Sequence, residues 1–98
     1  MITVRFFKEN RGFSVSGHSG YAQEGSDIIC AGISSAAYMT ANTLTEIIGA
    51  KTDIDVRDGF MELRLHETTK ETDVIMEGFR LHISQFAAQY PEYVIQKD

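Results

Sequence analysis

Apolar and polar residues alternate along two stretches near the start of the chain, which is the pattern of half-buried strands. Residues 2–7 are rich in β-branched and aromatic side chains, and in residues 12–18 apolar residues alternate with serines. A polar turn over residues 9–12 separates the two stretches. The pattern therefore predicts a β-hairpin over residues 2–18.

The pattern then changes to a glycine-rich segment followed by a long run without charge. Gly17, Gly20 and Gly25 fall within nine positions, which predicts a flexible loop over residues 19–27. The charge-free run that follows contains many small residues and predicts a helix over residues 28–48. Its hydroxyl and amide side chains are too polar for a membrane span, so we expect a buried helix.

A second pair of alternating stretches follows and predicts another β-hairpin over residues 54–66. Asp58 and Gly59 lie at its centre, and both residue types are typical of a type I′ turn. The two ββα halves of the chain are similar only in outline, so we infer no duplication.

The last third of the chain predicts a helix and a short strand. Thr68 and Glu71 match the spacing of a capping box, and apolar residues then recur at helical spacing up to Pro91. These signals predict a helix over residues 69–90 and a strand over residues 92–97. The complete order, ββαββα(β), predicts an α+β fold: a four- or five-stranded, mostly antiparallel sheet with two helices packed on it.

Length and charge narrow the function classes. A chain of 98 residues has room for one domain, over residues 1–98. Nine Lys and Arg against fourteen Asp and Glu give a net charge of −5, which disfavours direct binding to nucleic acid or a membrane and suits a basic protein partner. The single cysteine excludes an intrachain disulfide, and no leader segment is visible, so we expect a cytoplasmic protein.

One nucleophile and one base flank the predicted loop. Cys30 lies about three residues into the predicted helix, where the positive end of the helix dipole favours a thiolate over a thiol. His18 lies twelve residues earlier, and the loop can bring its imidazole to the sulfur. Together they can act as a nucleophile and general base. The alternative is that Cys30 is a small buried packing residue, as most single cysteines are.

Two neighbouring residues can support this pair. Asp27 can cap the helix or orient the imidazole of His18. Ser34, one turn after Cys30, can steady the sulfur or an oxyanion, or it can be a small packing residue. We interpret His66 and His82 as structural, and we expect neither a metal nor another cofactor.

Residues 17–22, Gly-His-Ser-Gly-Tyr-Ala, and residues 25–34, Gly-Ser-Asp-Ile-Ile-Cys-Ala-Gly-Ile-Ser, resemble the ribosomal-processing cysteine protease family. Length and element order resemble that family over essentially the whole chain. The resemblance implies a cytoplasmic bacterial endopeptidase, usually a homodimer, that removes the N-terminal extension of a large-subunit ribosomal protein. It also implies that Cys30 is the nucleophile, His18 is the general base, Asp27 and Ser34 are supporting residues, and the glycine loop orders over bound substrate.

Two other functions remain open at the level of sequence. The first is a non-enzymatic, acidic homodimeric module that binds a ribosomal protein or an assembly intermediate and uses Cys30 only for packing. The second is a redox-sensing thiol, which needs a resolving partner that a chain with one cysteine does not supply.

Overall fold

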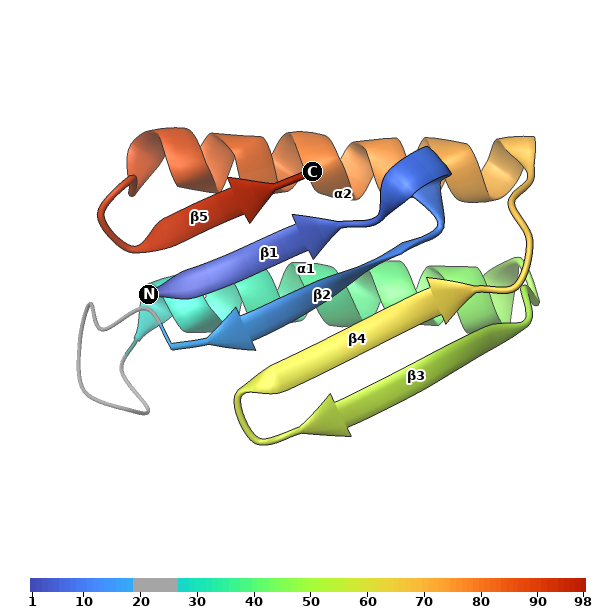
Figure 1. Cartoon of the computed structure of the whole chain (residues 1–98), viewed down its shortest axis with the longest axis horizontal. Coiled ribbons are helices and arrows are strands. Elements are labelled where there is room, and N and C mark those ends of the chain that lie inside the picture. The colour runs from blue at the N-terminus through green and yellow to red at the C-terminus, as the bar shows by residue number, and fades with distance from the viewer. Residues whose placement is uncertain (19–26) are drawn as a thin grey trace.

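A computed structural model of the chain describes residues 1–18 and 27–98. The elements are, in order, β1 (Ile2–Phe6), the 3₁₀ turn η1 (Lys8–Asn10), β2 (Gly12–Gly17), α1 (Ile28–Asn42), the π-helical turn η2 (Thr43–Ile47), β3 (Thr52–Arg57), β4 (Phe60–Leu65), α2 (Lys70–Gln89) and β5 (Val94–Lys97). Figure 1 shows both helices lying behind the sheet along the direction of its strands.

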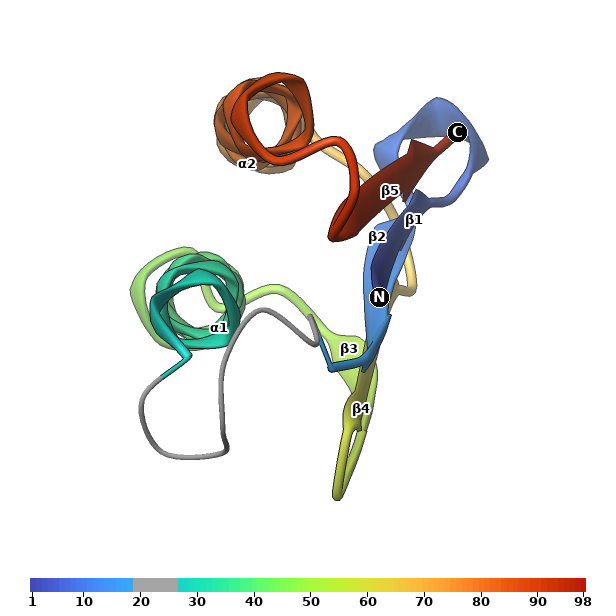
Figure 2. The same cartoon turned by 90° about the vertical axis from the view of Figure 1, so that its left-hand side faces the viewer.

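The strands form one mixed sheet with the order β3-β4-β2-β1-β5. β5 runs parallel to β1, and the other three pairs are antiparallel. Both helices cover the same face of the sheet, and Figure 2 shows that the β3 and β4 end of the sheet extends past α1. The predicted fold class, a mostly antiparallel sheet with two helices packed on it, is confirmed.

The core lies between this sheet face and the two helices. Phe79 of α2 meets the rings of Phe6 and Phe13 edge-on, at centroid distances of 5.5 Å and 4.7 Å. Burying each such side chain stabilises the fold by about 1.5–3 kcal/mol. The largest fully buried side chains come from the sheet and from both helices, and they are Phe13, Ile2, Ile29, Ile33, Leu44, Leu63, Met76, Ile83, Val4 and Thr72.

A glycine allows the two helices to lie close together. A Cβ atom on Gly32 of α1 would lie 2.7 Å from Cζ of Phe86 on α2, which is too close for two carbon atoms. The edge of the Phe86 ring therefore occupies the space that a side chain at position 32 would fill.

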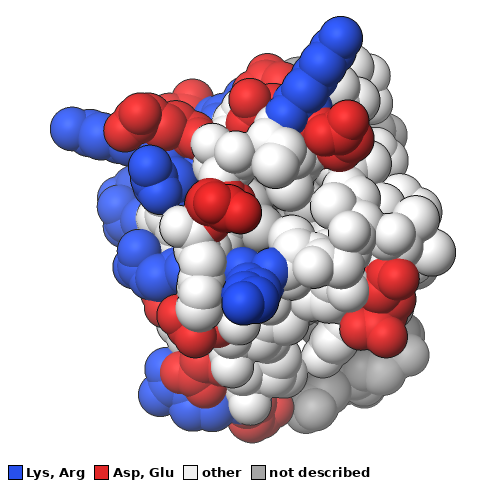
Figure 3. Space-filling model, turned by 90° about the vertical axis from the view of Figure 1, so that its right-hand side faces the viewer, with Lys and Arg blue, Asp and Glu red and all other residues white. Residues whose placement is uncertain are grey.

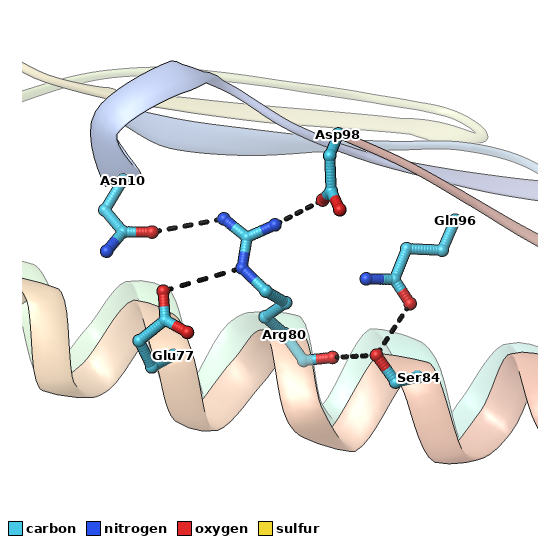
Figure 4. A network of polar contacts seen from close by, with 6 residues as sticks. All are labelled: Asn10, Glu77, Arg80, Ser84, Gln96 and Asp98. Atoms are coloured by element: carbon cyan, nitrogen blue, oxygen red, sulfur yellow. Dashed lines mark hydrogen bonds and ion pairs between the residues drawn. The ribbon is translucent and has the colours of Figure 1, made fainter.

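Arg80 of α2 connects the helix to the β1–β2 turn and to the residue that follows β5 (Figure 4). Its guanidinium donates to Oδ1 of Asn10 at 3.1 Å and to the Asp98 carboxylate, and its Nε lies 3.6 Å from Oε2 of Glu77. The same group lies over the Phe6 ring, 4.6 Å from its centroid. These contacts hold the β1–β2 turn and the end of the chain against α2.

The type I′ turn was predicted for the wrong hairpin. Glu9 and Asn10 both have positive φ, 59° and 57°, as a type I′ turn requires. In the β3–β4 turn only Gly59 has a positive φ, of 71°, and Asp58 does not. Asn adopts this region more readily than most residues, and the bond from Arg80 to Asn10 adds a tertiary contact that local sequence does not reveal.

The capping box of the second helix also lies one residue later than predicted. Thr69 is the N-cap, and its hydroxyl accepts from the Thr72 amide at 3.2 Å, while the Thr72 hydroxyl accepts from the Thr69 amide at 2.8 Å. The proposed pair of Thr68 and Glu71 is therefore wrong. Thr72 is 1% exposed, so burial of its side chain selects this register.

The first helix, predicted to be continuous over residues 28–48, changes to π-helical geometry in its last turn. The Thr43 and Thr45 hydroxyls donate to the carbonyls four residues earlier, at 2.7 Å and 3.0 Å. Such bonds compete with the backbone ladder and disturb a helix near its end. The Ile48 amide accordingly donates to the carbonyl of Thr43, five residues back.

Charge is distributed unevenly between the two helices. Figure 3 shows the end of the molecule at the right of Figure 1, where Lys, Arg, Asp and Glu side chains gather on the sheet side and the helical side has few of them. α1 itself contains no charged residue. None of the helices described by the structure is long and apolar enough to cross a membrane.

The identity of the residue that caps α2 can be tested with two alanine substitutions. We expect Thr69→Ala to lower the free energy of unfolding by about 1 kcal/mol, because the Thr72 amide at the start of α2 loses its acceptor. The matched change Thr68→Ala should alter it by less than about 0.5 kcal/mol. Urea unfolding of the two variants measures both values, and a larger loss for Thr68→Ala would contradict the observed register.

Candidate active site

One cavity of about 500 Å³ collects all four described polar residues that the sequence singled out. It lies between the end of β2, the start of α1 and the β3–β4 hairpin. His18, Asp27, Cys30 and Ser34 all line it. The predicted nucleophile and base, twelve residues apart in sequence, therefore share one cavity.

The position of His18 is determined by the end of β2. The Gly17 amide donates to the Gly59 carbonyl at 2.9 Å, and the N-terminal ammonium of Met1 donates to the His18 carbonyl. Gly17 has a φ of 89°, and a Cβ atom there would lie 2.4 Å from the Met1 carbonyl oxygen. Only glycine fits this position, so the chain leaves the sheet here and His18 lies at the surface of the molecule.

The imidazole of His18 lies directly over Gly59. Its Nε2 atom is 3.3 Å from the point where a Cβ atom of residue 59 would be. Sequence reasoning missed this role of Gly59, although the Asp58-Gly59 pair was a clear turn signal. The glycine makes room for the ring because it has no side chain.

Asp27 caps the helix that carries Cys30. Its Oδ1 atom accepts from the amides of Ile29 and Cys30, both at 3.0 Å, and its carbonyl accepts from the Ala31 amide at 3.1 Å. Cys30 is half-buried in the first turn of α1. The capping role considered for Asp27 is therefore present in the structure.

The rest of the cavity wall is mainly apolar. Ser34 lies one turn after Cys30 and is exposed, and beyond it α1 contributes Ala37 and Tyr38. Val56 and Met61 face them from β3 and β4. A wall of this kind suits the side chains of a polypeptide better than a highly charged small molecule.

The remaining site predictions fall in two groups. Gly20 and Gly25, with the predicted flexible loop, lie outside the described residues. His66 and His82 lie outside the cavity: His66 Nε2 is 3.1 Å from Oδ2 of Asp53, and His82 contacts the ring of Phe86 at 5.3 Å. Across residues 1–18 and 27–98, no group of three His, Cys, Asp or Glu side chains could hold a metal ion.

Comparison with known proteins identifies relatives of the whole chain. The family model described as "Cysteine protease Prp" matches residues 1–95. The ribosomal processing cysteine protease Prp of Bacillus subtilis (strain 168) is 23% identical over 87 residues, which are 82% of this chain and 78% of that protein.

Two crystal structures of an essential ribosomal processing protease Prp from S. aureus have the same fold. The complex with a covalently linked product peptide has a TM-score of 0.89 at 23% identity, and the match covers 99% of this chain and 98% of the other. The complex with a substrate peptide has a TM-score of 0.80 at 20% identity, covering 98% and 95%.

The cap can be tested by two substitutions at one position. We expect Asp27→Ala to lower the free energy of unfolding by about 1 kcal/mol, because the Ile29 and Cys30 amides lose their acceptor. Asp27→Asn should lower it by about 0.5 kcal/mol or less, since an amide oxygen still caps and only the charge is lost. Equal losses in urea unfolding would contradict a capping role.

The contact between His18 and Gly59 has a matched control in the same chain. Gly59 and Gly49 have similar φ values, 71° and 77°, but nothing lies within 4 Å of a Cβ atom on Gly49. Alanine at either position should cost about 1 kcal/mol of backbone strain. We expect only Gly59→Ala to shift the NMR signals of the His18 ring, and equal shifts in both variants would contradict the contact.

Proposed function

Because the chain belongs to the family of the cysteine protease Prp, a ribosomal processing family, we propose that it is a cysteine endopeptidase in which Cys30 is the nucleophile and His18 the general base. Its substrate is the N-terminal extension of a large-subunit ribosomal protein. The observation that carries the proposal is the shared cavity, because His18 and Cys30 line it together at the positive end of α1.

The proposed reaction has two stages. His18 accepts the thiol proton, and the Cys30 sulfur attacks the scissile carbonyl carbon to form a C–S bond. The carbonyl then re-forms, the C–N bond breaks, and His18 gives its proton to the leaving amine. His18 next removes a proton from water, and the water oxygen attacks the thioester carbon. The C–S bond breaks, His18 returns the proton to the sulfur, and the carboxylic acid product loses its proton to solvent.

The start of α1 also determines how the oxyanion is stabilised in this mechanism. The Cys30 amide already donates to the Asp27 carboxylate at 3.0 Å. We propose that the oxyanion shares this amide while the substrate is bound, since it lies beside the attacking sulfur and at the positive end of the helix. The hydroxyl of Ser34 is a second donor on the same cavity wall.

The proposed partners follow from charge and from the family. A net charge of −5 favours encounter with a basic ribosomal protein, because complementary fields speed association. By resemblance, the protein acts in the cytoplasm as a homodimer, without a cofactor and without direct contact to nucleic acid.

Cleavage of a ribosomal-protein precursor tests the proposal directly. We expect the parent protein to remove the N-terminal extension, with a mass change that locates the cut. Cys30→Ala and His18→Ala should each reduce kcat by at least 1,000-fold, as in enzymes that lose a member of a catalytic pair. His82→Ala is the matched control, because this histidine lies outside the cavity and should leave kcat within about twofold.

Each result separates the proposed enzyme from the binding module. Binding of the precursor without cleavage by the parent protein would support the non-enzymatic module and contradict the proposed protease. Cleavage that continues at the parent rate in Cys30→Ala would contradict the role of the cysteine.

A further inference from the structure

β3 (Thr52–Arg57) is an exposed edge of the sheet. Within the described part of the chain its one strand neighbour is β4. Five of its six residues are exposed, and it contains neither proline nor lysine. Exposed edges offer unpaired backbone groups to another chain, so natural proteins usually shorten or block them.

The opposite edge of the same sheet provides the contrast. β5 has four residues, ends at Lys97, and has a buried first residue, Val94. Its Gln96 side chain accepts from the Ser84 hydroxyl of α2 at 2.9 Å. β5 is thus short and attached to α2, whereas β3 is longer and open.

The helix-facing side of β3 has uncovered apolar residues. Ile54 and Val56 pair with Leu63 and Met61 of β4 and point to the same side as these residues. Leu63 and Met61 are buried, yet Ile54 and Val56 are 46% and 49% exposed. The reason is visible in Figure 2, where this end of the sheet extends past α1. An additional strand beside β3 would cover both side chains.

The other side of β3 has a charge pattern that selects the additional strand. The side chains of Asp53 and Asp55 are 77% and 54% exposed and lie two residues apart, on one side of the strand. Opposite charges on neighbouring strands stabilise the pairing, and like charges oppose it. Arg57 lies on the same side of the strand, with its guanidinium 3.2 Å from the Asp55 carboxylate, so this side has two carboxylates and one cation. Basic residues opposite Asp53 and Asp55 therefore fit this edge better than acidic residues do.

β3 also leads into the candidate active site. Val56 and Arg57, its last two residues, line the cavity that contains His18 and Cys30. A strand paired with β3 would therefore be continuous with a chain that enters this cavity.

We propose that the unpaired edge of β3 binds the polypeptide substrate as an additional β-strand, with apolar side chains beside Ile54 and Val56 and basic side chains opposite Asp53 and Asp55. The inference rests on the proposed protease function, because it assigns the edge to the same substrate. Backbone hydrogen bonds supply affinity in this mode, and the alternating side chains supply specificity.

Two synthetic ten-residue peptides test the charge pattern, one alternating Val and Lys and the other alternating Val and Glu. Their binding to the Cys30→Ala protein is measured by fluorescence anisotropy, so that no cleavage is needed. We expect the lysine peptide to bind about tenfold more tightly. The double variant Asp53→Lys with Asp55→Lys should reverse this preference. The control, Glu46→Lys with Glu92→Lys, has the same change in net charge and should keep the preference.

Backbone methylation tests the strand pairing itself. Alternate amides of a strand point to opposite edges, so N-methyl groups on one alternate set of lysine-peptide amides should abolish binding. N-methyl groups on the other set should leave binding within about threefold. Equal effects of the two sets would overturn the proposal.

Three further results would also overturn it. The first is that the lysine peptide does not bind, and the second is that both charge-reversed pairs change the peptide preference equally. The third is that Asp53→Lys with Asp55→Lys loses a dimer in sedimentation while its peptide binding is unchanged. The last result would assign the edge to a second copy of the chain. Cleavage of the ribosomal-protein precursor by the parent protein would leave the proposed function intact in each case.

Discussion

β2 lies between β1 and β4, and hydrogen bonds from both sides determine the point at which it ends. The Gly17 amide reaches the Gly59 carbonyl, and the backbone of the next residue is held by Met1. His18 follows this last pair, so its imidazole lies beside the hairpin turn and in the same cavity as Cys30. The catalytic arrangement proposed for this chain therefore depends on strand pairing.

The start of α1 combines a stabilising and a chemical role. Asp27 satisfies two amides that would otherwise lack an acceptor, and one of them belongs to Cys30. The same bond therefore fixes the first turn of the helix and places Cys30 on the wall of the cavity that His18 also lines.

Sequence patterns were sufficient for the fold class but not for its local geometry. Alternation and helical spacing report which side chains are buried, and burial determines the layers. The type I′ turn at Glu9 and Asn10 receives a bond from Arg80, 70 residues away, and the capping box includes the buried side chain of Thr72. Both are tertiary effects. The candidate site could also be predicted only in part. Spacing and family resemblance indicated Cys30 and His18, but the space that Gly59 leaves for the His18 ring follows only from the relative positions of the two hairpins.

Close contact between Gly32 and Phe86 links the far side of the molecule to this cavity. Gly32 lies two residues after Cys30, and the Phe86 ring fills the space where its side chain would be. A larger residue at position 32 would force either the Phe86 ring or α1 itself, with its cysteine, to shift. We therefore expect related proteins with a larger residue at position 32 to have a smaller one at position 86, because the two side chains share one space between the helices.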